Sequence, residues 1–180
     1  MHQARFSAAL LAQAKSIRVL LLDVDGVLTD GGLYFNEHGE STKRFHTLDG
    51  QGLKMLQKAG IQAVVISGRD SPALRMRLAG LQMEHARFAV EDKRVAADQC
   101  LQALGADWQQ AAAMGDDWPD LAMMLPSAMA FAPANAHPEV LSRAHHVTQA
   151  SGGQGAVREV CDLLLQASGH YPAYLSEALA

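Results

Sequence analysis

Five aspartates stand at two points of the sequence, and each point follows an apolar run. Two come after the run 17–22 and three come after the run 111–115: Asp23, Asp25, Asp116, Asp117 and Asp120. If these carboxylates meet in the fold, two that lie about 4 Å apart repel by roughly 4 kcal/mol at an effective dielectric of 20. Mg²⁺, a hard cation that prefers oxygen ligands, would relieve this repulsion. The sequence therefore predicts a magnesium site.

Ser67 and Lys93 add the other groups that phosphoryl transfer requires. Attack on a phosphate needs a nucleophile, a proton source for the leaving alcohol and neutralisation of charge on the transferred group. Asp23 is a candidate nucleophile that can form an aspartyl-phosphate, and Asp25 a candidate general acid and base. The Ser67 hydroxyl and the Lys93 ammonium would contact the phosphate. Alone, a serine after a strand is usually a turn residue and a lysine that begins a helix a solvated charge, so the hypothesis depends on their convergence.

Alternating apolar runs and helical patterns predict the elements that would bring these residues together. We expect strands at 17–22, 61–67, 86–90, 111–115, 128–132 and 146–148. We expect helices at 4–15, 50–59, 72–80, 92–104, 117–125 and 157–165, with a short one after Pro138. This alternation predicts a three-layer α/β/α Rossmann-like fold with a central parallel sheet. Ligands bind at the carboxyl ends of the strands in such sheets, where the polar residues above stand.

Two segments lie outside this alternation. The strands 33–36 and 41–45, joined by a turn at 37–40, predict a β-hairpin inserted at about 31–46. Only about 35 residues separate the first acidic motif from Ser67, and an independent domain needs roughly 50. We therefore expect one domain over 1–180, with the protruding hairpin in place of a cap domain. The segment 169–180 is expected to be a flexible tail.

The bulk composition excludes several classes of protein. The formal net charge of −4 and the lack of a basic stripe argue against a nucleic-acid partner. No apolar run reaches 18 residues, so no membrane span is expected, and the stretch 8–12 is too short for a signal-peptide core. Cys100 and Cys161 fall within helical patterns, which predicts buried free thiols and a cytoplasmic protein without disulfides.

Four motifs resemble those of the haloacid dehalogenase superfamily of phosphatases. The segments 23–30 (DVDGVLTD), 67–69 (SGR) and 115–120 (GDDWPD), together with Lys93, match its first, second, fourth and third motifs in the family's order. The resemblance covers roughly 15–165. It implies a magnesium-dependent phosphatase in which Asp23 is the nucleophile.

The resemblance also implies roles for the individual acidic residues. Asp23 and Asp116 would give carboxylate oxygens to Mg²⁺, and Asp25 would give its backbone carbonyl. Asp117 would support these ligands from behind, and Asp120 is a weaker candidate for the metal.

Three further segments resemble the capless 3-deoxy-D-manno-octulosonate 8-phosphate phosphatases. They are 43–45 (KRF), 49–50 (DG) and 152–159 (GGQGAVRE). The resemblance implies a small phosphorylated sugar acid as substrate, a role in lipopolysaccharide sugar synthesis, and a homotetramer whose hairpins and tails complete neighbouring sites. Its implied substrate-binding residues are Thr29, Lys43, Gly68, Arg69 and Arg158. Arg69 would contact the substrate carboxylate, because a planar guanidinium suits a carboxylate.

Three alternatives remain open at this point. A nine-carbon acylneuraminate or deaminated neuraminate 9-phosphate is the nearest competing substrate, although arginine after Gly68 is more similar to the octulosonate enzymes. A phospho-accepting receiver domain also has an acidic pocket, a hydroxyl and a lysine, but its acceptor ends the third strand, whereas Asp23 ends the first. A catalytically silent regulatory subunit would keep only the scaffold.

Overall fold

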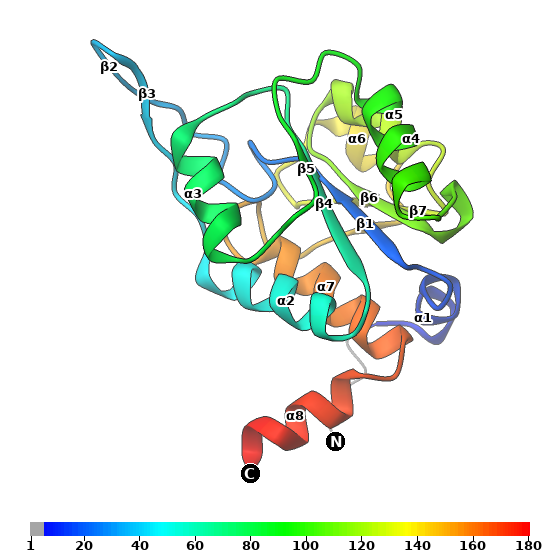
Figure 1. The fold of residues 1–180 in the computed structure, drawn as a ribbon. Helices are drawn as coiled ribbons and strands as arrows, with labels where there is room; N and C mark the ends of the chain where they lie inside the picture. Colours follow the sequence, from blue (N-terminus) through cyan, green and yellow to red (C-terminus); the bar gives the residue numbers. More distant parts are fainter. Residues whose placement is uncertain (1–5) are drawn as a thin grey trace.

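A sheet of six parallel strands forms the centre of the computed structural model, which describes residues 6–180 (Figure 1). Its strand order is β5-β4-β1-β6-β7-β8. The strands are β1 (Val19–Leu22), β4 (Gln62–Ile66), β5 (Ala86–Arg87), β6 (Ala111–Met114), β7 (Met129–Ala132) and β8 (His146–Val147). All residues of β1, β6 and β7 are buried, as expected of parallel strands covered on both faces. The predicted parallel sheet is confirmed.

Helices cover both faces of this sheet. On one side lie α1 (Ala8–Ala14), α2 (Thr47–Lys58), α3 (Pro72–Gly80) and α7 (Ala156–Ala167). On the other lie α4 (Lys93–Ala103), α5 (Leu121–Met124) and α6 (Pro138–Leu141). The predicted three-layer arrangement is therefore confirmed. Residues 4 and 5 of the predicted first helix lie outside the described residues, and the described helix begins at Ala8 because the Ser7 hydroxyl accepts a hydrogen bond from the Leu10 N–H.

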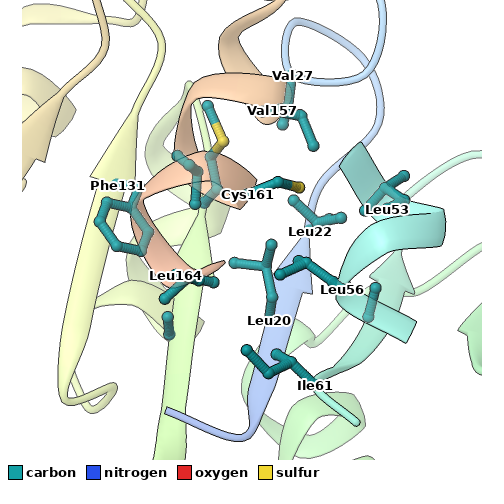
Figure 2. Close-up of a cluster of buried hydrophobic side chains, with 14 of the residues drawn as sticks. Leu20, Leu22, Val27, Leu53, Leu56, Ile61, Phe131, Val157, Cys161 and Leu164 are labelled. Atoms are coloured by element: carbon teal, nitrogen blue, oxygen red, sulfur yellow. The ribbon is translucent and has the colours of Figure 1, made fainter. Parts of the chain in front are cut away.

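The alternation of side chains along β1 supplies both halves of the core. Leu20 and Leu22 point into the cluster with α2 and α7 (Figure 2), whereas Val19 and Leu21 belong to the cluster on the opposite face. Leu56 of α2 is fully buried in the first cluster. Full burial of a leucine contributes about 1.5–3 kcal/mol. The central strand, which precedes Asp23, is thus held on both faces.

Three predicted elements differ in their extent. The strand expected at 86–90 covers only Ala86–Arg87, because Ala89 has φ 51°, which an extended strand cannot continue. The helix expected at 117–125 is divided into a 3₁₀ turn, η2 (Trp118–Asp120), and the short α5. Asp117 and Asp120 form a capping box around that turn, which fixes its hydrogen bonds locally. The helix expected at 50–59 starts earlier, at Thr47, where a His46 ring nitrogen accepts from the Leu48 N–H.

The hairpin projects from the body and forms a separate two-stranded sheet (Figure 1). Its strands are β2 (Tyr34–Asn36) and β3 (Gly39–Thr42). The second strand starts and ends earlier than the predicted 41–45. Gly39 adopts φ 110° at the tip, and Lys43 turns inward to become buried, so the strand ends before it.

The segment 169–180, which was expected to be a flexible tail, has regular secondary structure over most of its length. It contains the helix α8 (Tyr171–Leu179), with Pro172 in its first turn. Tyr171 and Tyr174 pack against the cluster formed by α2 and α7, and Lys58 pairs with Glu177 at 2.5 Å. A groove of about 490 Å³ lies between α2 and α8. None of the helices within residues 6–180 has the length and apolar character needed to cross a membrane.

Candidate active site

Asp23 stands directly after β1, at the carboxyl edge of the sheet. Its backbone N–H donates to the carbonyl of Met114 at the end of β6, at 3.1 Å, so the two strand ends are tied together. Its side chain is buried, with a residue exposure of 6%. The N–H groups of Val27, Leu28 and Thr29 all donate to the carbonyl of Val24, which gives the following loop a tight turn.

Lys93 reaches Asp23 from the first residue of α4. Its ammonium donates to Asp23 Oδ1 at 2.5 Å and to Asp120 Oδ1 at 2.6 Å. The helix starts here because the Asp92 carboxylate caps it, accepting from the N–H groups of Arg94 and Val95. Burial would lower the pKa of Lys93, but the two carboxylates overcome this effect and raise it, so the ammonium stays charged.

Asp120 shapes the loop after β6 as well as contacting Lys93. Its Oδ2 accepts from the backbone N–H of Asp116 at 2.9 Å and of Asp117 at 3.2 Å. The sequence suggested Asp120 only as a weaker metal candidate and did not predict its contact with Lys93. A signal for the loop role was present in the Asp-x-x-Asp spacing from Asp117, which is typical of a capping box.

Three carboxylates converge into a group that can hold a cation. Oxygen atoms of Asp23, Asp116 and Asp120 all lie within 4.8 Å of one another. Burial first, and then the Asp120 carboxylate, raises the pKa of Asp23 to about 6, against the opposing effect of Lys93. Burial, followed by the neighbouring carboxylates, raises the pKa of Asp116 to about 7. The single ammonium of Lys93 does not neutralise the group, and an all-oxygen donor set suits Mg²⁺.

The other two predicted metal residues direct their carboxylates elsewhere. Asp117 Oδ1 accepts from the Trp118 N–H at 2.8 Å, and its side chain is not in the group of three. The Asp25 carboxylate contacts the ammonium of Lys43. The predicted role of the Asp25 backbone carbonyl stays a prediction.

Gly26 allows the loop after β1 to approach Asp116. It has φ 94°, which L side chains rarely adopt, and a Cβ at this position would lie 2.0 Å from Asp116 Oδ2. Any other residue would displace either the loop or the carboxylate. This is a physical reason for the glycine that follows Asp25.

The second motif follows β4, the neighbour of β1 in the sheet. Ser67 is 1% exposed, and its Oγ accepts from the Arg69 N–H at 3.1 Å, so the turn through Gly68 is closed locally. Thr29, a predicted substrate-binding residue, is also buried. Its hydroxyl oxygen accepts from the Gly26 N–H at 3.3 Å and therefore stabilises the loop.

Lys43 and Arg69 lie on either side of the Asp25 carboxylate. The Lys43 side chain is only 2% exposed and pairs with both Asp25 and Glu40, the latter at 2.6 Å. Arg69 Nε lies 3.9 Å from Asp25 Oδ2, and its Nη1 lies 3.8 Å from Glu40 Oε2. Burial would lower the pKa of Lys43, but its hydrogen bonds to the two carboxylates raise it. The sequence analysis missed Glu40, which belongs to no motif.

Arg158 is placed apart from the Asp23 group. Its backbone N–H donates to Asp49 Oδ1 at 2.8 Å, and its Nε donates to Asp162 on the same helix at 2.7 Å. Its side chain also lines the groove between α2 and α8. Within one chain, this arrangement is that of a helix-surface charge.

Comparisons with known proteins identify the family of this chain. Residues 89–160 match the model of a family described as haloacid dehalogenase-like hydrolase. The chain is 40% identical over 163 residues to the 3-deoxy-D-manno-octulosonate 8-phosphate phosphatase KdsC of Escherichia coli, covering 91% of this chain and 87% of the relative.

Solved structures give the same result. A probable YrbI family phosphatase from Pseudomonas syringae matches with a TM-score of 0.94 and 44% identity, covering 97% of this chain and 99% of the other. The Moraxella catarrhalis 3-deoxy-D-manno-octulosonate 8-phosphate phosphatase, solved with a magnesium ion, a phosphate ion and a KDO molecule, matches with a TM-score of 0.91 and 32% identity, covering 96% and 99% of the two chains.

Proposed function

This chain belongs to the 3-deoxy-D-manno-octulosonate 8-phosphate phosphatases among the haloacid dehalogenase-like hydrolases, and we propose from that premise that this sugar phosphate is its substrate. It is a phosphoric monoester hydrolase. The products of the proposed reaction are the free sugar acid and inorganic phosphate. The contact of Lys93 with Asp23, beside the carboxylates of Asp116 and Asp120, carries the proposal, because it combines a nucleophile with a fixed positive charge.

In the first half of the proposed reaction, an Asp23 oxygen attacks the phosphorus. A P–O bond to Asp23 forms, and the bond from phosphorus to the sugar oxygen breaks. Asp25 donates its proton to that leaving oxygen. Lys93 fixes the Asp23 carboxylate in position and places positive charge beside the transferred group.

In the second half, water attacks the phosphorus of the aspartyl-phosphate. Asp25 accepts the water's proton, and the bond to Asp23 breaks, which restores the free carboxylate and releases phosphate. The Ser67 hydroxyl, at the end of the neighbouring strand, is the proposed donor to a phosphate oxygen during both steps.

Mg²⁺ fits the site because three carboxylates converge there beside the single ammonium of Lys93, while burial and the mutual repulsion of the carboxylates raise the pKa values of Asp23 and Asp116. We assign the metal to these two carboxylates, the Asp25 carbonyl and, behind them, Asp117. Asp120 is a further candidate ligand by position. When bound, the ion supplies Lewis-acid stabilisation of charge on the phosphoryl oxygens.

Arg69 and Lys43 are the proposed contacts for the acidic end of the substrate. Both cations stand beside Asp25, and Arg69 is half exposed, with its guanidinium able to offer a planar pair of donors. We assign Thr29 and Gly68 to the walls of the site. For Arg158 we propose a contact with a neighbouring subunit.

A nine-carbon acylneuraminate or deaminated neuraminate 9-phosphate is the alternative substrate. We also propose a cytoplasmic homotetramer that acts in lipopolysaccharide precursor synthesis. Exposed apolar side chains on the hairpin, such as Phe35 at 62%, and on α8, such as Leu179 at 79%, support an assembly.

Phosphate release from the two acid phosphates, each with Mg²⁺ and with a chelator, tests the proposal. We expect magnesium-dependent turnover that favours the eight-carbon substrate. Asp23→Asn should lower kcat by at least about 10⁴-fold without loss of the folded state measured by circular dichroism. Faster turnover of the nine-carbon substrate at equal concentration would select the alternative, and near wild-type rates for Asp23→Asn would remove it as the nucleophile.

A further inference from the structure

Glu40 brings a negative charge from the hairpin into the mouth of the active site. It lies on β3, and its side chain is only 13% exposed. One carboxylate oxygen pairs with the Lys43 ammonium at 2.6 Å, and the other lies 3.8 Å from Arg69 Nη1. The same two cations flank Asp25. These four side chains therefore form one cluster, which we call the mouth cluster.

Both cations of the mouth cluster lie beside carboxylates in the substrate-free structure. Lys43 and Arg69 contribute two positive charges, and Asp25 and Glu40 contribute two negative charges when ionised. An anionic substrate that enters this arrangement finds both cations already paired, and its own carboxylate meets the Glu40 carboxylate at close range. If Glu40 leaves, one positive charge is set free for an incoming anion.

Two features favour departure of Glu40 from Arg69, although its pair with the buried Lys43 is short. Its contact with Arg69 is long, and the Arg69 side chain is 48% exposed, so water competes for this pair. Glu40 is carried by a two-stranded hairpin that is not hydrogen-bonded to the central sheet, and isolated hairpins are marginally stable. A small shift of β3 would remove the carboxylate without disturbing β1 or β4.

We propose that Glu40 is a specificity residue that occupies the place of the substrate's carboxylate and gives it up when an acidic sugar phosphate binds. This inference rests on the proposed function and adds a means of selecting acidic substrates. Phosphate esters without a carboxylate cannot replace Glu40 on the two cations. The enzyme therefore discriminates by exchange of one carboxylate for another, in addition to direct attraction.

The test compares wild type with Glu40→Gln on two substrates, 3-deoxy-D-manno-octulosonate 8-phosphate and arabinose 5-phosphate, a sugar phosphate without a carboxylate. For the variant, we expect KM for the acid substrate to fall by about threefold or more, whereas KM for arabinose 5-phosphate should change by less than about twofold. Glu40→Asp keeps the charge and should restore the wild-type KM. A higher KM for the acid substrate, or an equal change for both substrates, would overturn the proposal.

Glu37→Gln is the matched control, because Glu37 lies on the same hairpin with its side chain 82% exposed and lies 3.7 Å from its neighbour His38, away from the mouth cluster. It removes the same charge away from the mouth cluster and should leave both KM values unchanged. An equal effect of both variants would indicate net charge alone and would reject the proposed exchange.

Calorimetry with the free sugar acid, which has no phosphate, separates this inference from the proposed function. Glu40→Gln should bind this acid at least about threefold more tightly than wild type does, whether or not the phosphate ester is turned over. Equal affinities would reject the role of Glu40. Absence of turnover by wild type would instead count against the proposed substrate.

Discussion

Asp23 and Asp116 carry pKa values of about 6 and 7, against an ordinary value of 3.8. Between these values the folded metal-free protein holds protons that the unfolded chain has already lost. The stabilising contribution of the two groups is therefore full below pH 3.8 and is lost as pH rises through about 7. We expect the Tm of the metal-free protein to fall between pH 4.5 and pH 8, and Mg²⁺ to restore it at pH 8.

Thermal unfolding in a chelator, over that pH range, measures this effect. Asp116→Asn removes one of the two titrating groups, so its Tm should fall less steeply between pH 4.5 and pH 8. An identical pH dependence in this variant would contradict the assignment.

Asp120 and Asp117 give a second test at the level of single residues. Asp120 contacts Lys93 and holds two backbone N–H groups, whereas Asp117 caps only a local turn. We expect Asp120→Asn to lower kcat by on the order of 10²-fold and Asp117→Asn by less than about tenfold. Steady-state phosphate release with saturating Mg²⁺ measures both. The opposite ranking would show that Asp117 contributes more to the proposed site than Asp120 does.

The sequence was informative about residues that follow strands and uninformative about those that meet across the hairpin. Asp23, Lys93 and Asp116 were candidates because they stand at strand ends or helix starts, and parallel pairing brings such positions together. Glu40 has no such marker. Its contact with Arg69 depends on where the hairpin folds back, which no local pattern records.

Among the elements, α7 is capped by a residue of another helix. Its own N-cap, Gly155, has no side chain, and the buried Asp49 of α2 accepts from the Arg158 N–H instead. We expect Asp49→Ala to reduce the free energy of unfolding by about 1–2 kcal/mol, as for loss of an N-cap. Asp49→Asn keeps an acceptor oxygen and should lose less. Urea unfolding measures both, and equal losses would show that capping is not the cause.

Gly152 and Gly153, which precede α7, contact the backbone of the loop that follows Asp23. The Gly153 N–H donates to the Val27 carbonyl at 3.0 Å, and a Cβ on Gly152 would lie 1.7 Å from the Gly26 carbonyl oxygen. Gly152→Ala should therefore displace the loop that carries Asp25. We expect a loss of about 1–3 kcal/mol in stability and a larger proportional loss of kcat.

Gly80→Ala provides the control for this substitution. No atom lies within 4 Å of a Cβ at Gly80, which ends α3, so the change should be neutral or stabilise by about 0.4–1 kcal/mol. Urea unfolding and phosphate release are measured on both variants. A Gly152→Ala enzyme with wild-type kcat would show that the loop does not need this contact.

Element types were predicted well from periodicity, and their ends less well. The helix 72–80 matches α3, because Pro72 and Ser71 mark its start in the sequence. The terminal helix α8 was not predicted, because the segment 169–180 was interpreted as a flexible tail. In the structure Pro172 occupies the first turn, where its missing N–H costs nothing.

For the molecule as a whole, α8 and the hairpin are the parts that depend least on the central sheet. Deletion of 169–180 should leave a folded protein, because α8 contributes only Tyr171 and Tyr174 to the core cluster. If α8 reaches a neighbouring site, as the resemblance to the octulosonate phosphatases implies for the tail, KM should rise by about threefold or more and the mass in solution should change.

Light scattering and steady-state kinetics test this deletion. Lys58→Gln is the control, since it leaves α8 in place and removes the exposed pair with Glu177 and the cation–π contact with Tyr174, each of which typically contributes about 0–1 kcal/mol. An unchanged KM and an unchanged mass in the deletion variant would show that α8 contributes neither to a neighbouring site nor to assembly. The sequence predicted the three-layer fold because the alternation of strand and helix patterns is a local feature of the sequence. The assembly of subunits depends instead on contacts with a second chain.

The position of β1 in the sheet has a consequence for an enzyme whose backbone has been cut by a protease. The hairpin turn at Glu37 and His38 is exposed and follows β1 and β2 but precedes all the other strands of the described residues, so a protease that cuts there divides the chain into two pieces. The smaller piece carries the proposed nucleophile directly after β1, which pairs with β4 along one edge and with β6 along the other. A nicked molecule should therefore remain associated, and such cleavage would separate β2 from β3 at the hairpin turn while the carboxylates of Asp23, Asp116 and Asp120 stayed assembled.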